Sequence, residues 1–355
     1  MKTNISLFFI LCVLLSCTDA EEILSSKDVP NTTLTNANQL DFGPVNFAFW
    51  TELQAPVVPS YYYPNDRQNI FLMSVTGNYY AMWYMGDYVI YKLNTTTMHW
   101  EYLSLLGNAQ SLKWEHQRLF SYQDKLYVGL GTRTDLPVPA PYGQRYFGAV
   151  DLETMTEVSL APFPGTPARD VMSFIIGSKG YVAGGYSLST NQALDQLWEY
   201  DIPSNQWTNK GRIPGGARAG GSAFVMGNSV YYGLGYNFMD ENKNTTRKID
   251  WHVWNSETGF GTRLTSFIGQ SRYDAQGFTM DNKIYVGWGR STSWLKDLWE
   301  FNPADNTWKQ KTECPEEYHN DNNIKVFQRR NKAYAVVGTL NGFWRYSKNE
   351  LVAVP

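Results

Sequence analysis

The strongest constraint on the fold is an internal repeat, in which a short apolar strand ending in glycine recurs along the chain. Four copies stand at Leu126–Gly131, Gly180–Gly185, Val230–Gly235 and Ile284–Gly289. Their last glycines, at positions 131, 185, 235 and 289, are separated by 54, 50 and 54 residues. Two copies that lack the full glycine pair, Tyr79–Tyr84 and Ala333–Gly338, keep the register. The period predicts an array of six similar units.

A second recurring element follows the glycine strand and consists of a strand, a polar turn and a strand that ends in a large ring. Its copies are Trp198–Trp207 and Trp299–Trp308, with weaker ones at Tyr91–Trp100, Val150–Val158 and Val253–Phe260. Pro, Asn and Asp between the two strands favour tight turns. With the apolar strand before each glycine pair, every unit therefore contains four short strands. Since no unit has a competing helical period, the chain is predicted to be all-β.

Paired glycines at a strand end and a Trp that closes the fourth strand resemble the kelch repeat, whose period is about 50 residues. The resemblance covers Val45 to the C-terminus and is strongest in the third and fifth units. It implies a six-bladed β-propeller of four-stranded antiparallel blades over residues 41–355. The repeated tryptophans are expected to pack between blades: Trp100, Trp198, Trp207, Trp299 and Trp308.

Closure of the ring has two solutions. Phe49–Leu53, followed by Pro56, resembles the outermost strand at Trp207–Pro214. We therefore expect the N-terminal strand near Trp50 to complete the last blade. In the alternative, Leu351–Val354 completes that blade and Trp50 lies outside the ring.

The first residues indicate export. Lys2 precedes the apolar run Ile5–Leu15, which is too short for a transmembrane helix and typical of a signal peptide. Leu14–Cys17 resembles the lipobox of bacterial lipoproteins, which implies a signal peptide over residues 1–16 and a lipid on Cys17. The alternative is ordinary secretion with cleavage near Ala20.

The residues after Cys17 indicate the compartment and a tether. Thr18, where Asp would signal retention in the inner membrane, favours an outer-membrane lipoprotein of a Gram-negative bacterium, facing the periplasm or exposed at the cell surface. The acidic residues that follow resemble a cell-surface signal. Residues 17–40 are polar and poor in large apolar side chains, so we expect a flexible tether.

Composition limits the partners. Of three cysteines, Cys12 would leave with the signal peptide and Cys17 would be lipidated, which leaves Cys314 and no intramolecular disulfide. The formal net charge is −3, and no basic run suggests a nucleic-acid partner. The expected membrane contact is the lipid anchor alone, and the expected state is a monomer.

Arginines recur near the start of the units. Arg67, Arg218 and Arg272 each stand 13 residues before a second-strand tyrosine (Tyr80, Tyr231 and Tyr285), and Arg169 stands 12 before Tyr181. Arg290 directly follows Gly289, and Arg133 stands two residues after Gly131. Several guanidinium groups around one channel would suit a carboxylate such as that of an acidic sugar. The competing interpretation is that these arginines brace adjacent blades through carbonyls or acidic partners.

Aromatic residues that lie off the repeat pattern are candidates for stacking on a sugar. They occur in the loops after the glycines, at Tyr186, Tyr236, Trp294 and Tyr142. With the arginines Arg67, Arg133, Arg169, Arg218, Arg272 and Arg290, they form the predicted ligand-binding set.

No assembled catalytic set is visible. HExxH, P-loop, GxSxG and CxxC patterns are absent from the sequence, so no metal or cofactor is predicted. The kelch resemblance includes galactose oxidase, but the four histidines here are scattered among different units. It also includes sialic acid mutarotase, with which the chain shares the arginines and the compartment.

The leading hypothesis is a non-catalytic binding module for a carbohydrate or an envelope protein. A mutarotase or epimerase-like activity on an acidic sugar is the alternative, and a carboxyl group close to the arginines would favour it. A scaffold in an envelope complex is a third.

Overall fold

The computed structural model describes residues 47–53, 70–75, 78–84, 88–94, 96–97, 99–105, 117–130, 145–187, 189–239, 245–311, 313, 324–329, 332–337 and 342–349. The chain divides into two compact units, Met1–Val45 and Asn46–Pro355, and every described residue belongs to the second. The predicted signal peptide, Cys17 and the tether lie outside the described residues.

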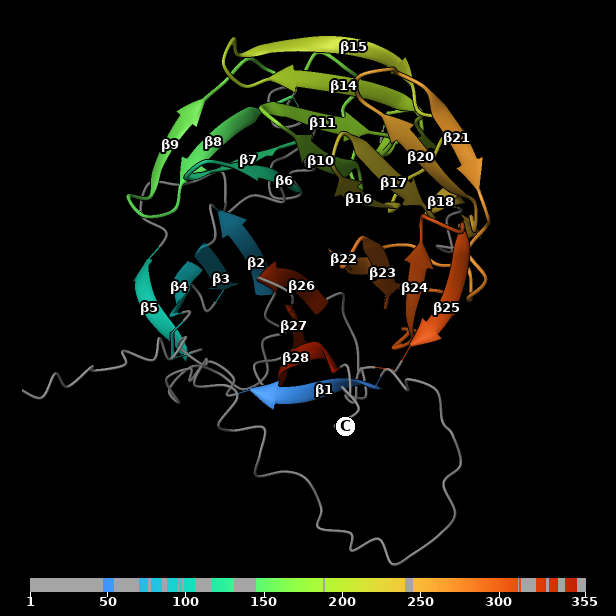
Figure 1. Cartoon of the computed structure of the whole chain (residues 1–355). Coiled ribbons are helices and arrows are strands. Elements are labelled where there is room, and N and C mark those ends of the chain that lie inside the picture. Colours follow the sequence, from blue (N-terminus) through green and yellow to red (C-terminus); the bar gives the residue numbers. More distant parts are fainter. Residues whose placement is uncertain are drawn as a thin grey trace, which may run out of the picture. The chain divides into compact units, whose positions relative to one another are not determined.

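The described chain is built from antiparallel β-strands, which confirms the all-β prediction (Figure 1). Four-stranded sheets recur, and we number them by their position in the chain. Sheet one holds β2 (Ile70–Val75), β3 (Asn78–Tyr84), β4 (Tyr88–Asn94) and β5 (His99–Leu105). Sheet two holds β6 (Gln117–Tyr122), β7 (Lys125–Gly129), β8 (Phe147–Asp151) and β9 (Thr156–Ser159).

The next two sheets each carry an extra hairpin. Sheet three holds β10 (Met172–Ile176), β11 (Lys179–Ala183), β14 (Gln196–Asp201) and β15 (Gln206–Arg212). Its hairpin pairs β12 (Tyr186–Ser187) with β13 (Gln192–Ala193). Sheet four holds β16 (Ser222–Met226), β17 (Ser229–Gly233), β20 (Trp251–Asn255) and β21 (Gly261–Leu264), and its hairpin pairs β18 (Tyr236–Met239) with β19 (Thr245–Arg247).

The last two sheets complete the series. Sheet five holds β22 (Gln276–Met280), β23 (Lys283–Gly287), β24 (Leu298–Asn302) and β25 (Thr307–Lys311). Sheet six holds β26 (Ile324–Arg329), β27 (Lys332–Val337), β28 (Gly342–Asn349) and β1 (Phe47–Leu53). The first strands of consecutive sheets contact each other, and β26 also contacts β2.

The glycine pattern has two separate physical causes. Gly233 ends β17, where a Cβ atom would come within 2.2 Å of the carbonyl oxygen of Asp250, the residue just before the neighbouring strand β20. Gly235 has a φ of +85°, and its N–H donates to the Arg272 carbonyl, in the segment that leads into sheet five, at 2.9 Å. The first glycine thus permits close strand approach, and the second permits a left-handed turn that links neighbouring sheets.

Trp207 and Trp308 fill the space between sheets, as predicted, and the side chain of Trp100 lies outside the described part of the structure. The Trp308 ring packs against Phe267, Trp251 and Phe301 with centroid distances of 4.9, 5.2 and 4.8 Å. Its Nε1–H donates to the Thr265 carbonyl at 3.1 Å. Trp207 repeats this arrangement between sheets two and three, with its Nε1–H donating to Ala161 at 3.0 Å.

Sheets three and five each bury a carboxylate of the third strand, which is hydrogen-bonded by two side chains of the second strand. Glu300 accepts hydrogen bonds from the Lys283 ammonium and the Tyr285 hydroxyl, both at 2.8 Å. Glu199 repeats the arrangement in sheet three with Lys179 at 2.7 Å and Tyr181 at 2.9 Å. Sheet four has Val253 at the equivalent position opposite Tyr231 and lacks the pair.

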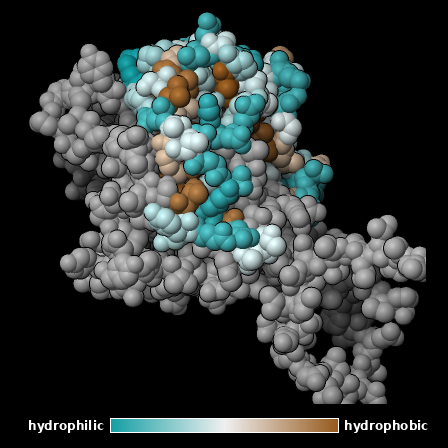
Figure 2. Space-filling model, turned by 90° about the vertical axis from the view of Figure 1, so that its left-hand side faces the viewer, coloured by the Kyte–Doolittle hydropathy of each residue, from teal (hydrophilic) through white to brown (hydrophobic). Residues whose placement is uncertain are grey.

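The described part of the surface in Figure 2 is mainly hydrophilic, with hydrophobic residues scattered among polar ones. Large exposed apolar side chains include Val158 and Phe260. Among the described residues, no helix has the length and apolarity needed to cross a bilayer.

Candidate functional site

The candidate site is built on a backbone bridge that sheets three, four and five repeat. In each, the residue three positions before the first strand exchanges two hydrogen bonds with the residue that follows the second glycine. The bridged pairs are Arg169 with Tyr186, Ala219 with Tyr236, and Tyr273 with Arg290. The repeat therefore holds side chains from three sheets in equivalent backbone positions. We call Arg169, Asp170, Tyr186, Tyr236, Arg247, Tyr273, Asp274, Arg290 and Trp294 the loop cluster.

Sheet three contributes an arginine and a carboxylate to the loop cluster. The Arg169 guanidinium lies over the Tyr186 ring, 5.2 Å from its centroid, and its Nε is 3.6 Å from Asp170 Oδ2. The side chains of Arg169 and Asp170 are 37% and 35% exposed. The Tyr236 hydroxyl, from sheet four, donates to the same Asp170 oxygen at 2.7 Å. Asp170 is thus held by a neighbouring sheet while it stays accessible to solvent.

Sheet five contributes the other end of the loop cluster. The Tyr273 ring meets Tyr236 edge to face at 5.3 Å, and Tyr236 in turn lies 5.9 Å from Tyr186. Arg290 is exposed, and its guanidinium lies 5.5 Å from the centroid of the half-buried Trp294 ring. The tyrosines thus form a continuous aromatic contact between the two arginine-bearing ends.

Three residues with left-handed backbone form a row along the loop cluster. Asp170, Gly220 and Asp274 have φ values of 55°, 60° and 55°. The Gly220 N–H donates to the Asp170 carbonyl and the Asp274 N–H donates to the Gly220 carbonyl, both at 2.8 Å. Because non-glycine residues rarely adopt this conformation, the two aspartates are sites of backbone strain. Such strain occurs at ligand sites more often than elsewhere.

The charge of the loop cluster favours an anion. Burial and the Asp170 carboxylate raise the pKa of Tyr236 far above its ordinary value, so its hydroxyl remains a donor. Burial also raises the pKa of Tyr273, although the charges of Arg290 and Arg247 oppose that shift. Three arginines thus face two aspartates, which leaves a net positive charge.

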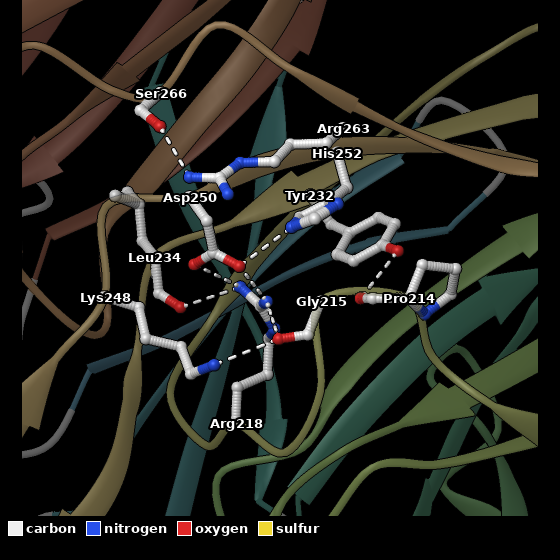
Figure 3. A network of polar contacts seen from close by, with 10 residues as sticks. All are labelled: Pro214, Gly215, Arg218, Tyr232, Leu234, Lys248, Asp250, His252, Arg263 and Ser266. Carbon is white, nitrogen blue, oxygen red and sulfur yellow. Dashed lines mark hydrogen bonds and ion pairs between the residues drawn. The ribbon is translucent and has the colours of Figure 1, made fainter.

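Arg218 and Arg272 are fully buried and braced. The Arg218 guanidinium donates to Asp250 Oδ2 at 2.6 Å and to the carbonyls of Leu234 and Gly215 at 3.3 and 3.1 Å (Figure 3). Arg272 donates to both oxygens of Asp297 and to the Trp288 carbonyl. This geometry matches the bracing interpretation, because each guanidinium is occupied by groups of its own chain.

The network around Asp250 includes two further cationic or titratable side chains. His252 Nε2 lies 2.8 Å from Asp250 Oδ2, and Lys248 Nζ donates to the Gly215 carbonyl at 3.0 Å (Figure 3). Burial raises the pKa of Asp250, but hydrogen bonds from His252 and Arg218 outweigh it and hold the pKa well below its usual range. Burial lowers the pKa of Lys248.

The structure corrects the spacing argument for Arg169. The residue four positions before the first strand is Arg218 in sheet four, Arg272 in sheet five and Ala168 in sheet three. Arg169 is therefore offset by one position, which turns its side chain toward Tyr186 and Asp170. In sheet three, Gln196 takes over the bracing by bonding the backbone of Thr166 at both amide atoms.

The predicted aromatic candidates differ in exposure. Tyr186 and Tyr236 are 3% and 0% exposed, so their rings are buried beneath the loop cluster and do not offer a surface to a ligand. Trp294 is half-buried. Arg67, Arg133 and Tyr142 lie outside the described residues, as does Cys314.

Sequence reasoning missed Asp170, Arg247, Tyr273 and Asp274. Asp170 and Asp274 do carry a signal, since each stands two residues before its first strand in the sequence Arg-Asp or Tyr-Asp. Arg247 pairs with Tyr236 in the hairpin of sheet four, whereas the hairpin of sheet three places Ala193 opposite Tyr186, so the repeat does not predict an arginine there. Among the described residues, no group of three or more His, Cys, Asp or Glu side chains is placed to hold a metal ion.

No known protein-family profile matches the sequence. A kelch domain-containing protein of Vibrio cholerae is 26% identical over 204 residues, which is 54% of this chain and 48% of the relative. An N-acetylneuraminate epimerase of Pasteurella multocida is 29% identical over 119 residues, 32% of this chain and 29% of the relative. The chain thus matches less than half the length of each of these relatives.

Among solved structures, one described as the structure of YjhT is 16% identical, with a TM-score of 0.49. The match covers 61% of this chain and 70% of that one.

Proposed function

Because the chain belongs to the kelch-type propeller family, we propose that it is a binding protein for a carboxylate-bearing sugar and that the loop cluster holds the ligand. The observation that carries this proposal is the joining of Arg169, Asp170 and Arg290 through three tyrosine rings. Guanidinium groups bind carboxylates, and carboxylates accept hydrogen bonds from sugar hydroxyls. The partly exposed rings of Tyr273 and Trp294 are placed to contact the apolar face of a sugar.

Arg290 is the residue best suited to receive the ligand's carboxylate. It is exposed, and in the described part of the chain it has no ion pair with an acidic side chain. Arg218 and Arg272 are instead committed to Asp250 and Asp297, so ligand binding falls to the arginines outside the buried pairs.

The proposed architecture is a closed ring of six blades, with β1 completing the last one. Contacts between first strands of consecutive sheets and between β26 and β2 support closure. The pairing of β1 with β28 from Phe47–Asn349 to Leu53–Phe343 supports the role of the N-terminal strand. In such a ring the loop cluster would face the central channel.

The proposed location is the outer membrane of a Gram-negative bacterium, with the lipid on Cys17 as the anchor. Leu14–Cys17 and the short apolar run before it support this proposal. A monomer that faces the periplasm or the outside would then meet free sugars or envelope glycans.

A thermal-shift series tests the proposed function. The full-length chain is heated with galacturonic acid, glucuronic acid, N-acetylneuraminic acid, galactose or glucose. A ligand that binds the native state raises the unfolding midpoint by mass action. We expect a shift with one or more of the acids, a smaller shift in Arg290→Ala, and no shift with neutral sugars. Arg212→Ala is the matched control, because Arg212 is exposed and its acidic partner among the described residues is Asp195. No shift with any acid would contradict the proposal.

A second candidate function is anomer exchange on the same sugar, and the Tyr236–Asp170 hydrogen bond favours it. An accessible carboxylate that is fixed by a buried hydroxyl can accept a proton in a defined position. Asp170 would take the proton of the anomeric hydroxyl while the ring oxygen gains one from water, and the ring C–O bond breaks to give the open carbonyl form. Closure on the opposite face reverses these transfers, so atoms and electrons balance.

Polarimetry of a freshly dissolved acidic sugar separates the two functions. We expect faster anomer equilibration with the wild type and near-background rates with Asp170→Asn. Binding of the sugar without faster anomer equilibration would contradict the exchange activity and support the binding function only.

A further inference from the structure

Resting on the proposed function, we infer that the ligand is an acidic oligosaccharide of at least two sugar units. The inference comes from the placement of cationic groups at both ends of a row that crosses sheet four. Arg169 and Asp170 stand at one end, and Tyr273, Asp274 and Arg290 stand at the other.

The length of the row sets the length of the ligand. Two backbone hydrogen bonds, each of 2.8 Å, connect Asp170 to Gly220 and Gly220 to Asp274. Hydrogen-bonded strand segments lie about 4.8 Å apart, so the two ends are separated by roughly 10 Å of backbone. One pyranose unit spans about one of these spacings between hydrogen-bonded segments. A monosaccharide therefore reaches one end, and a disaccharide reaches both.

The two ends have different chemistry. Arg169 shares its charge with Asp170, whose carboxylate lies 3.6 Å away, whereas Arg290 has no acidic partner among the described residues. The Arg290 end therefore takes a carboxylate. The Arg169 end, which offers both a donor and an acceptor, takes the hydroxyls of a second unit.

Small residues occupy the middle of the row. Sheet four places Ala219 and Gly220 where its neighbours place Arg169 with Asp170 and Tyr273 with Asp274. A Cβ atom on Gly220 would come within 2.9 Å of Asp274 Oδ1, so glycine leaves room for this carboxylate over the row. The large side chain that sheet four places between the two ends is Tyr236, whose ring contacts Tyr186 and Tyr273 and is fully buried.

Titration calorimetry of the full-length chain with galacturonic acid, digalacturonic acid and lactose tests this inference. We expect the acidic disaccharide to bind about tenfold or more tightly than the monosaccharide, and lactose to bind weakly or not at all. Arg169→Ala should weaken binding of the disaccharide about tenfold and leave the monosaccharide within about twofold. Arg290→Ala should weaken both, and Arg212→Ala should weaken neither.

Equal affinity for the two acids, or a disaccharide affinity unchanged in Arg169→Ala, would overturn the inference while the proposed function stands. Absence of binding for both acids would overturn the proposed function as well. Unfolding midpoints of all variants establish that each one is folded.

Discussion

Arg272 meets Asp297 through two parallel hydrogen bonds, Nη1 to Oδ1 at 2.5 Å and Nη2 to Oδ2 at 2.6 Å, with the arginine side chain fully buried. The Nε–H of Arg272 also donates to the Gln270 carbonyl at 2.9 Å. Arg218 and Asp250 repeat the pair in sheet four. These pairs tie the segment before the first strand to the residue that precedes the third strand, and they thereby fix the backbone that carries the loop cluster.

Removing one partner of such a pair should be costly. Arg272→Ala leaves the Asp297 carboxylate partly buried without its counterion, so we expect a loss of about 3–5 kcal/mol in the free energy of unfolding. Urea unfolding followed by fluorescence measures it. Arg212→Ala, which removes an exposed arginine, should cost under about 1 kcal/mol. A similar loss for the two variants would contradict the bracing role of Arg272.

Acid should destabilise the protein through the buried carboxylates. Burial raises the pKa values of Asp297 and Glu300, but hydrogen bonds and charge from Arg272 and Lys283 outweigh it and leave both pKa values lowered. A carboxyl with a lowered folded-state pKa contributes stability above its unfolded value, and this contribution is lost as pH falls through the folded value.

The unfolding free energy should therefore be nearly constant from about pH 7 to pH 5 and fall below about pH 4. Urea titrations at a series of pH values measure this profile. A Glu300→Gln variant should show a shallower acid limb, and an unchanged slope would contradict the assignment to this residue.

His252 occupies the place of a tryptophan. Trp198 and Trp299 donate from Nε1 to Gln196 and Asp297, and His252 Nε2 meets Asp250 at the equivalent position. His252→Ala leaves one fewer hydrogen bond on a partly buried carboxylate and should cost about 1–3 kcal/mol in unfolding free energy. His252→Gln, which retains a donor, should recover part of that loss. Equal losses would indicate that packing against Tyr232 is the main contribution.

Two buried tryptophans allow the contribution of an indole hydrogen bond to stability to be measured. Trp308 Nε1–H donates to the Thr265 carbonyl, whereas Trp251 Nε1 has no hydrogen-bond partner in the structure as described. Trp251→Phe removes an unsatisfied polar group and should cost less than Trp308→Phe, by about 1 kcal/mol. Thermal unfolding of the two variants decides between this ordering and the reverse.

The repeat was predictable from the sequence because each sheet uses the same local pattern of strands, turns and packing residues. The strand positions, the turn after Tyr200 and the packing of Trp207 and Trp308 follow from alternation, turn residues and spacing. The likeness of Phe49–Leu53 to an outer strand predicted a strand at these residues, and that strand is β1.

The loop cluster was only partly predictable. Its composition depends on a one-residue offset between Arg169 and Arg218. Such an offset reverses the direction of the side chain, and the repeat spacing alone does not reveal it. The bond from Tyr236 to Asp170 joins residues 66 apart through neighbouring sheets, so no local pattern contains it. Burial of Tyr186 and Tyr236 likewise depends on the hairpins that follow the glycines.

The most direct test of the account is the affinity for galacturonic acid compared with that for its neutral methyl ester, measured by titration calorimetry in about 0.05 M salt. The account predicts that the ester binds at least about tenfold more weakly, and that Arg290→Ala removes most of this difference. Equal affinity for acid and ester in the wild type, or a difference that persists undiminished in Arg290→Ala, would contradict carboxylate recognition by the loop cluster.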